Sequence, residues 1–156
     1  MESADDAPPA PTAPPRWVDV GVVHPLRMEV LRPGRPPGSS AYAGDDDPRA
    51  RHGAVVVDDA VASVGTVFPD ASPWEPGRVD AWRVRGMATR EGLRRRGFGH
   101  SVLGALIEHA RASGGLFIWC EARIGAIAFY QRSGFVTEGE PFVLDDVEHI
   151  HMWREL

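Results

Sequence analysis

The chain has 156 residues with a net charge of -5, and its 17 basic residues are all arginine. This length fits one domain with a single core, and the acidic balance argues against a general nucleic-acid binder. There is no apolar run of about 18 residues and no apolar leader, which argues against a membrane span and a secretory signal. Cys120 is the single cysteine, which argues against an intrachain disulfide and a multi-cysteine zinc site. We therefore expect a metal-independent cytoplasmic domain that is a monomer or a homodimer.

The N-terminal segment is rich in proline, alanine and aspartate, and five of the 14 prolines fall within the first 15 residues. Such a segment has too little apolar surface to offset the entropy of ordering, so residues 1–16 are predicted to form a disordered tail. A single folded domain is expected over residues 17–156. Its first pattern, Trp17–Val23, is rich in β-branched residues and predicts a strand, and Leu26–Leu31 predicts a short helix that begins at Pro25.

A long polar loop is expected over residues 33–51, and it contains three adjacent aspartates, Asp45–Asp47. Three carboxylates suggest a metal, but these lack the alternating oxygen ligands and the glycine of a calcium loop. We therefore interpret them as a solvated turn. The next two strands are predicted over Ala54–Val57 and Ala60–Phe68, and the two aspartates between them indicate a hairpin.

The second half of the chain alternates strand and helix patterns. Asp80–Thr89 alternates apolar and basic residues, which predicts a strand. Gly97–Ala112 is the clearest helix, because its apolar residues recur at helical spacing and Ser113–Gly115 ends it. A strand, a second helix and two closing strands are predicted over Leu116–Cys120, Gly125–Ser133, Phe135–Glu138 and Ile150–Trp153. This order predicts a mixed α/β domain of the α+β type.

A turn rich in glycine and arginine joins the strand that ends at Thr89 to the clearest helix. The first amides of a helix lack intrahelical partners and lie at the positive end of its dipole. Gly97 and Gly99 allow close backbone approach, and Arg94–Arg96 add forked donors, which together are typical of a phosphate or pyrophosphate site. The chain has no lysine for a Walker loop, and Val102 replaces the third glycine of a Rossmann pattern. From these residues alone, an arginine-rich surface turn is the alternative.

Two motifs in this order resemble those of the GCN5-related N-acetyltransferase (GNAT) superfamily. Arg94-x-x-Gly97-x-Gly99 resembles its acyl-CoA-binding signature, and Ala126–Phe135 resembles its A-x-x-F-Y-x-x-x-G-F segment. His24–Gly34 also resembles the first helix of one bacterial subgroup, so the resemblance covers residues 17–156. It implies the fold of an acyl-CoA N-acyltransferase: a mixed, mostly antiparallel sheet of about six or seven strands, flanked by helices and splayed between its fourth and fifth strands.

The resemblance implies that acetyl-CoA, or another acyl-CoA, is the co-substrate. The fourth strand of this fold carries a bulge, and its free main-chain groups pair with the pantetheine arm. Many members carry an asparagine for the pantetheine where this chain has Arg123, which is a departure from the pattern. The residues that match the cofactor-binding positions are Met87, Ala88 and Thr89 on the strand, Arg94, Arg95, Arg96, Gly97, Phe98, Gly99, His100 and Ser101 at the pyrophosphate, and Phe129 in the second motif.

The implied reaction is the direct attack of a primary amine on the acyl-CoA thioester. It requires removal of a proton from the attacking ammonium and donation of a proton to the leaving thiolate. Tyr130 matches the general acid of the family, and the pKa of a phenol, ~10, lies close enough to that of a thiol, ~8.5, for useful transfer. Glu121 ends the strand beside the splay, where it could hold the amine or a water that relays its proton. The alternative is that Glu121 is only a surface charge.

The acceptor, a small-molecule or peptide amine, is expected near the last strand and the first helix. His149 and His151 lie where acceptors enter in related proteins, although a lone histidine more often has a structural role, which is the alternative for each. Arg27 and Glu29, on one face of the first helix, either line the acceptor pocket or pair on the surface, and Cys120 is expected in the core. Two functions remain open: an N-acetyltransferase, which the intact motifs favour, and a non-catalytic acyl-CoA-binding or regulatory module.

Overall fold

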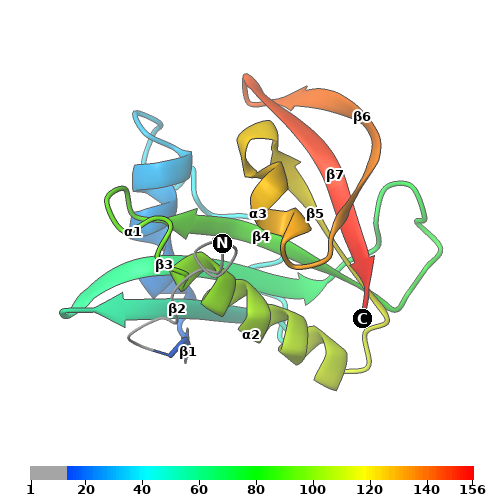
Figure 1. The fold of residues 1–156 in the computed structure, drawn as a ribbon, viewed down its shortest axis with the longest axis horizontal. Coiled ribbons are helices and arrows are strands. Elements are labelled where there is room, and N and C mark those ends of the chain that lie inside the picture. The colour runs from blue at the N-terminus through cyan, green and yellow to red at the C-terminus, as the bar shows by residue number, and fades with distance from the viewer. Residues whose placement is uncertain (1–13) are drawn as a thin grey trace, which may run out of the picture.

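The structure, a computed structural model, describes residues 14–156. The predicted tail therefore lies mostly outside the described residues, and the first strand begins at Arg16. Over the described part, the chain forms seven strands, three α-helices and one 3-10 turn (Figure 1). In chain order the elements are β1 (Arg16–Val18), α1 (Val20–Leu31), β2 (Arg51–Val57), β3 (Ala60–Pro69), β4 (Ala81–Thr89), α2 (Phe98–Ala112), β5 (Phe117–Arg123), η2 (Ile124–Ala126), α3 (Ile127–Gln131), β6 (Val136–Leu144) and β7 (Val147–Glu155).

The strands of the described chain form one sheet in the order β1-β2-β3-β4-β5-β7-β6. All neighbouring strands run antiparallel except β4 and β5, which run parallel. The hairpins β2–β3 and β6–β7 turn at aspartate pairs whose φ angles lie between 50° and 65°, in the left-handed region that a two-residue hairpin turn requires. The mixed, mostly antiparallel sheet expected from the sequence is confirmed.

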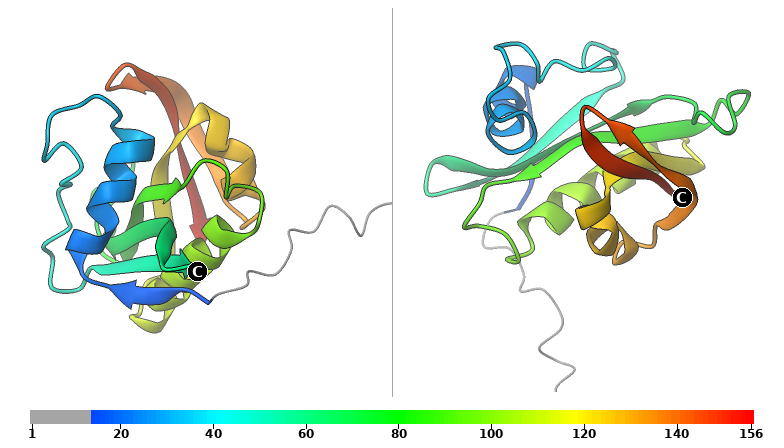
Figure 2. Two further views of the ribbon diagram at one scale, coloured as in Figure 1. Left: turned by 90° about the vertical axis from the view of Figure 1, so that its left-hand side faces the viewer. Right: turned by 90° about the horizontal axis from the view of Figure 1, so that it is seen from above.

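Helices cover both faces of the sheet: α1 lies on one face, and α2 and α3 lie on the other (Figure 2). Val23 and Leu26 of α1 pack against Val64 of β3 in a small apolar cluster. α2 anchors the larger core on the other face, because several of its large aliphatic side chains are buried there and the burial of each contributes about 1.5–3 kcal/mol. No helix within residues 14–156 has the length and apolarity that crossing a membrane requires. The residues of α2 that helical spacing predicts to be buried are all buried: Val102, Leu103, Leu106, Ile107 and Ala110; Phe98 and Gly99 in its first turn are buried as well.

The first helix begins earlier than the sequence predicts. The strand expected over Trp17–Val23 ends at Val18, and α1 already starts at Val20 with Pro25 inside it. β-branched content favours a strand there, and a proline favours a helix start. Tertiary packing decides otherwise, because the helical conformation brings the buried residues of α1 onto one face against the sheet.

The last hairpin is longer than its sequence pattern indicates. Strands are predicted over Phe135–Glu138 and Ile150–Trp153, whereas β6 continues to Leu144 and β7 starts at Val147. β6 lies at the edge of the sheet, and most of its residues are exposed. An edge strand with both faces exposed shows no apolar alternation, so periodicity underestimates its length.

The strands β4 and β5 pair only at their beginnings, from Ala81 opposite Phe117 to Arg83 opposite Trp119. Beyond this point they separate, which confirms the expected splay. A bulge in β4 lies at Gly86, where φ is 69° and where an added Cβ would lie 2.6 Å from Nε of Arg27. Only glycine satisfies both the left-handed conformation and this close approach.

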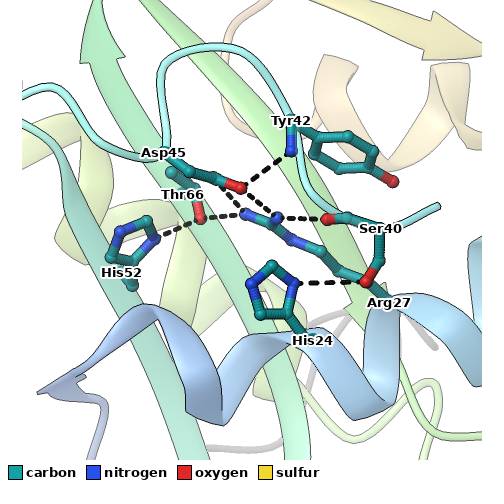
Figure 3. Close-up of polar contacts among 7 residues, drawn as sticks. All are labelled: His24, Arg27, Ser40, Tyr42, Asp45, His52 and Thr66. Atoms are coloured by element: carbon teal, nitrogen blue, oxygen red, sulfur yellow. Dashed lines mark hydrogen bonds and ion pairs between the residues drawn. The ribbon is translucent and has the colours of Figure 1, made fainter. Parts of the chain in front are cut away.

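Arg27 is fully buried between α1, β3 and the loop of residues 32–50 (Figure 3). Its guanidinium donates to both carboxylate oxygens of Asp45, at 2.8 and 2.9 Å, and to Oγ1 of Thr66 at 2.7 Å. Burial acts to raise the pKa of Asp45, but Arg27 and the amide of Tyr42 together lower it. The solvated turn expected at Asp45–Asp47 is therefore wrong for Asp45, which anchors the loop.

Three histidines, the buried His52 and the half-buried His100 and His109, are expected to make stability depend on pH. Burial lowers the pKa of His52, His100 and His109 below the ordinary value of 6.5. The unfolded chain therefore binds more protons than the folded chain just below pH 6.5. As a result, the free energy of unfolding is highest above pH 6.5 and decreases as the pH falls below it. Urea titrations from about pH 7.5 to about pH 5 measure this slope. Replacement of His52, the histidine beside Thr66, by Gln is expected to reduce it, and a flat profile in the native chain contradicts the assignment.

Candidate active site

A cleft with a volume of ≈ 1370 Å³ opens where β4 and β5 separate. One end, which we call the α2 side, lies between the β4–α2 loop, the start of α2, and α3. The other end, the α1 side, lies between the end of α1, the loop of residues 32–50, and the tip of the β6–β7 hairpin. The α2 side includes Thr89, Arg95, Gly97, His100, Phe129 and Tyr130, and the α1 side includes Tyr42, Arg83, Arg85, Glu121, Arg123 and His149.

The start of α2 presents free amides to the cleft. Gly97 precedes the helix with φ of 85°, and Arg95 also lies in the left-handed region with φ of 64°. No side chain caps α2, and within the described chain the amides of residues 97–100 have no backbone acceptor. Unpaired amides at the positive end of a 15-residue helix form an anion site.

Gly99 lets the first turn of α2 pack closely against α3. A Cβ at this position would lie 3.1 Å from the ring of Phe129 and 3.2 Å from Oγ1 of Thr89. The ring of His100 packs on the same Phe129, with centroids 4.5 Å apart. Burial and the charge of Arg132 lower the pKa of His100, so its ring is neutral at neutral pH. This packing closes one wall of the α2 side.

The arginines before α2 differ in their positions. Arg95 lines the cleft, and Arg94 lines it while its Nε donates to the carbonyl of Thr89 at 3.1 Å. Arg96 instead lies over the ring of Phe98, 5.1 Å from its centroid, and neither Arg96 nor Ser101 lines the cleft. Of the predicted cofactor-binding residues, the structure brings together Met87, Ala88, Thr89, Arg94, Arg95, Gly97, Phe98, Gly99, His100 and Phe129.

The edge of β4 that faces β5 is free beyond the last paired residue, Arg83. Residues 84–89 therefore border the cleft without a partner strand on this side, within the described part of the chain. The bulge also changes the faces of the strand, because Met87 packs under Gly65 on the α2 face while Ala88 joins the cluster of α1. The free edge offers backbone donors and acceptors to an extended ligand, as a neighbouring strand would.

Tyr130 projects from α3 into the cleft with only 7% of its surface exposed. Burial and the adjacent Cys120 thiol raise the pKa of Tyr130 well above its ordinary value, so the phenol keeps its proton. Burial likewise raises the pKa of Cys120, and its place in the core is confirmed. A protonated phenol in a shielded position is a hydrogen-bond donor and a proton source.

Glu121 of β5 lies on the α1 side, and only about a fifth of its side chain is exposed. Its carboxylate accepts from Nη2 of Arg83 at 2.6 Å and lies 3.5 Å from Nε2 of His151. Glu121 is thus a carboxylate held in place beside the splay rather than an isolated surface charge. His151 does not line the cleft, and it meets the site only through Glu121.

The residues predicted for the acceptor pocket divide into two groups. His149 lines the cleft, and its Nδ1 donates to the carbonyl of Val147 at 2.8 Å. Arg27 and Glu29 lie outside the cleft lining, unlike the expectation from the sequence. Arg27 forms a buried ion pair with Asp45, and Glu29 pairs with Arg90 at 2.9 Å on the surface. Residues two apart on a helix point to different sides, so Arg27 faces the core while Glu29 faces solvent.

Sequence reasoning missed Tyr42 and Arg85 as cleft residues. Tyr42 belongs to the loop that the sequence marks only as polar, and Arg85 is one of two arginines in β4. Arg123, known beforehand only as a departure from a motif, donates from Nη2 to the carbonyl of Leu31 at 2.8 Å and links β5 to the end of α1. The sequence signal that could have identified Arg85 is the alternation of residues in β4, which places Arg83 and Arg85 on one face of the strand.

Comparison with known proteins agrees with this geometry. A model described as "Acetyltransferase (GNAT) family" matches residues 23–135. The chain is 31% identical over 143 residues to the uncharacterized N-acetyltransferase YitI of Bacillus subtilis (strain 168), and the match covers 90% of this chain and 95% of that protein.

Solved structures share the fold at low identity. Escherichia coli ElaA has a TM-score of 0.74 at 18% identity, covering 92% of this chain and 100% of its own. A Bacillus subtilis acetyltransferase in complex with CoA has a TM-score of 0.67 at 15% identity, covering 93% of this chain and 99% of its own. Because the family model spans more than half of the sequence and the curated relative nearly all of it, the chain belongs to the acetyltransferase (GNAT) family.

Proposed function

We propose that this acyl-CoA-dependent N-acetyltransferase binds acyl-CoA with the pyrophosphate at the start of α2 and the pantetheine arm along the free edge of β4. The observation that carries the proposal is the set of unpaired amides at residues 97–100, directly after that edge. Arg94 and Arg95 add positive charge at the same place. A solved acetyltransferase with this fold binds CoA, which supports acyl-CoA as the co-substrate.

The thioester then lies in the splay, between the phenol of Tyr130 and the carboxylate of Glu121. The nitrogen of a primary amine attacks the thioester carbonyl carbon, and a C–N bond forms. The C–S bond breaks as the tetrahedral intermediate collapses, and the departing sulfur takes the proton of the Tyr130 phenol. The attacking nitrogen loses a proton to Glu121, directly or through water. The products are an amide and free CoA, and solvent returns the proton from Glu121 to Tyr130.

Substitution of Arg95 tests the cofactor position. Arg95→Gln is expected to raise the Kd of acetyl-CoA about 10-fold, because a charge-assisted hydrogen bond to phosphate is lost. Isothermal titration calorimetry measures the change. Arg96→Gln is the matched control: its side chain lies over Phe98 outside the cleft, so its Kd is expected to equal that of the native chain.

Two further measurements make the test selective. Acetyl-pantetheine lacks the nucleotide and the pyrophosphate, so Arg95→Gln is expected to leave its binding unchanged. Release of free thiol from acetyl-CoA, measured with a panel of amines, separates an enzyme from a module that only binds. Binding of acetyl-CoA without thiol release from any amine contradicts catalysis, and equal effects of the two arginine substitutions contradict the assigned position.

A further inference from the structure

An arginine on the α1 side of the cleft has no acidic partner. Arg85 lies ahead of the bulge in β4, on the face opposite to the buried Val84, and lines the cleft. Within residues 14–156 its guanidinium takes part in no ion pair and no hydrogen bond, whereas its neighbour Arg83 is paired with Glu121. A half-buried cation without a counter-charge is costly unless a ligand supplies one.

The balance of charge around Arg85 is positive. Arg32, at the end of α1, is neutralised by Asp145 at 2.6 Å. Arg123 bonds only to a backbone carbonyl, so its charge also lacks a carboxylate among the described residues. The remaining acidic group on this side, Glu148, is exposed at the rim. Burial and the charge of Arg83 lower the pKa of Arg85, and the carboxylates of Glu121 and Asp45 offset only part of this shift.

Tyr42 holds Arg85 in a defined orientation. The guanidinium carbon of Arg85 lies 4.4 Å from the centroid of the Tyr42 ring. The amide of Tyr42 donates to Asp45 at 2.9 Å, and Asp45 is fixed by the buried Arg27, so the ring belongs to an anchored part of the loop (Figure 3). The Tyr42 ring contacts the guanidinium through its π face and accepts no N–H hydrogen bond from it, so the N–H donors of Arg85 remain free for a two-oxygen partner.

We infer that the acceptor is an amine that also carries a carboxylate, as an amino acid does, and that Arg85 binds this carboxylate. Arg123 adds a second positive charge on the same side of the cleft. Glu121 lines the same cleft and is bound by Arg83, two residues before Arg85 in β4, so a carboxylate for the ammonium and an arginine for the acid group border one site. The inference rests on the proposed function and names its substrate class. The guanidinium fork binds two oxygens of a carboxylate or of a phosphate alike, and we favour the carboxylate because its single negative charge balances one unpaired guanidinium.

Matched pairs of acceptors test the inference on the full chain. Thiol release from acetyl-CoA is measured with each L-amino acid, with its carboxamide, and with aminoalkyl phosphonates. For the best amino acid, kcat/KM is expected to exceed that of its amide by about 10- to 100-fold, because only the acid forms the charge-assisted pair. Arg85→Gln is expected to lower kcat/KM for the amino acid to the value for its amide. The loss is expected as a higher KM for the acceptor, with the KM of acetyl-CoA unchanged. Arg85→Lys retains the charge and part of the preference.

Arg51→Gln is the matched control, because Arg51 also stacks on an aromatic ring, that of Trp17, but lies outside the cleft. It is expected to keep the full preference for the acid. The inference is overturned if the native chain uses the amide or the phosphonate with the same kcat/KM as the acid. It is also overturned if the preference for the acid survives Arg85→Gln. If no amino acid releases thiol, the inference is also wrong; thiol release with polyamines or aminoglycosides then shows that the proposed function still holds.

Discussion

Replacement of Tyr130 by Phe is expected to lower kcat by about 10²- to 10⁴-fold, the usual contribution of a positioned general acid. The departing sulfur then leaves without a proton from the protein. Burial and Cys120 raise the pKa of the phenol, which keeps it protonated through the neutral range, so its proton is present when the sulfur departs. Steady-state kinetics with saturating acetyl-CoA measure the loss, and no fall in rate from deprotonation of Tyr130 is expected below about pH 10 in the native chain.

The phenylalanine ring is expected to keep the packing of Tyr130. Its ring contacts Phe129 and Phe135 at centroid distances of 5.0 and 5.4 Å, and both contacts are apolar. The Tm and the Kd of acetyl-CoA are therefore expected to change little. Cys120→Ala removes the neighbouring thiol and retains the phenol, so its kcat is expected to stay within a few-fold of the native value. An unchanged kcat for Tyr130→Phe would exclude the acid role.

Replacement of Arg27 by Met is expected to lower the free energy of unfolding by about 3–5 kcal/mol, the usual cost of breaking a buried ion pair. The side chain is fully buried, that of Asp45 is only 7% exposed, and the substitution leaves the carboxylate without its counter-charge. The carbonyl of Ser40 and the hydroxyl of Thr66 lose a donor as well. Urea unfolding monitored by fluorescence measures the loss.

Glu29→Gln is the control on the same helix. Glu29 pairs with Arg90 at the surface, where about half of its side chain is exposed, so the expected change is below about 1 kcal/mol. The double variant Arg27→Met with Asp45→Leu is expected to regain part of the lost stability, because neither charge is then buried alone. A loss for Arg27→Met no larger than that for Glu29→Gln would contradict the anchoring role.

The residues proposed to bind the cofactor could be grouped from the sequence because the determinants of their positions are local. The strand that ends at Thr89, the turn with Gly97, and the helix from Phe98 to Ala112 follow one another directly, so one stretch of sequence carries the whole anion site. Ten of the predicted cofactor-binding residues line the cleft. Arg96 and Ser101 do not, because residues in a helical turn point in different directions and the sequence does not show which one meets the ligand.

The acceptor half depended on contacts between distant segments. Arg27 meets Asp45 across 18 residues, and Arg83 meets Glu121 across 38. Neither partner is indicated by spacing, because arginine is the only strong base in this chain and its many copies look alike in sequence. The same reasoning missed Tyr42, whose position is set by the anchored loop rather than by its own neighbours.

The sequence by itself thus determined the family, the order of most elements and the anion site at the start of α2. Only the tertiary structure decided that α1 begins at Val20, that Asp45 is buried, and that Arg85 is left without an acid partner. The physical reason is the range of the interactions. Turns, caps and helical periodicity act between neighbours in the chain, whereas burial and ion pairing are decided by what the fold brings together.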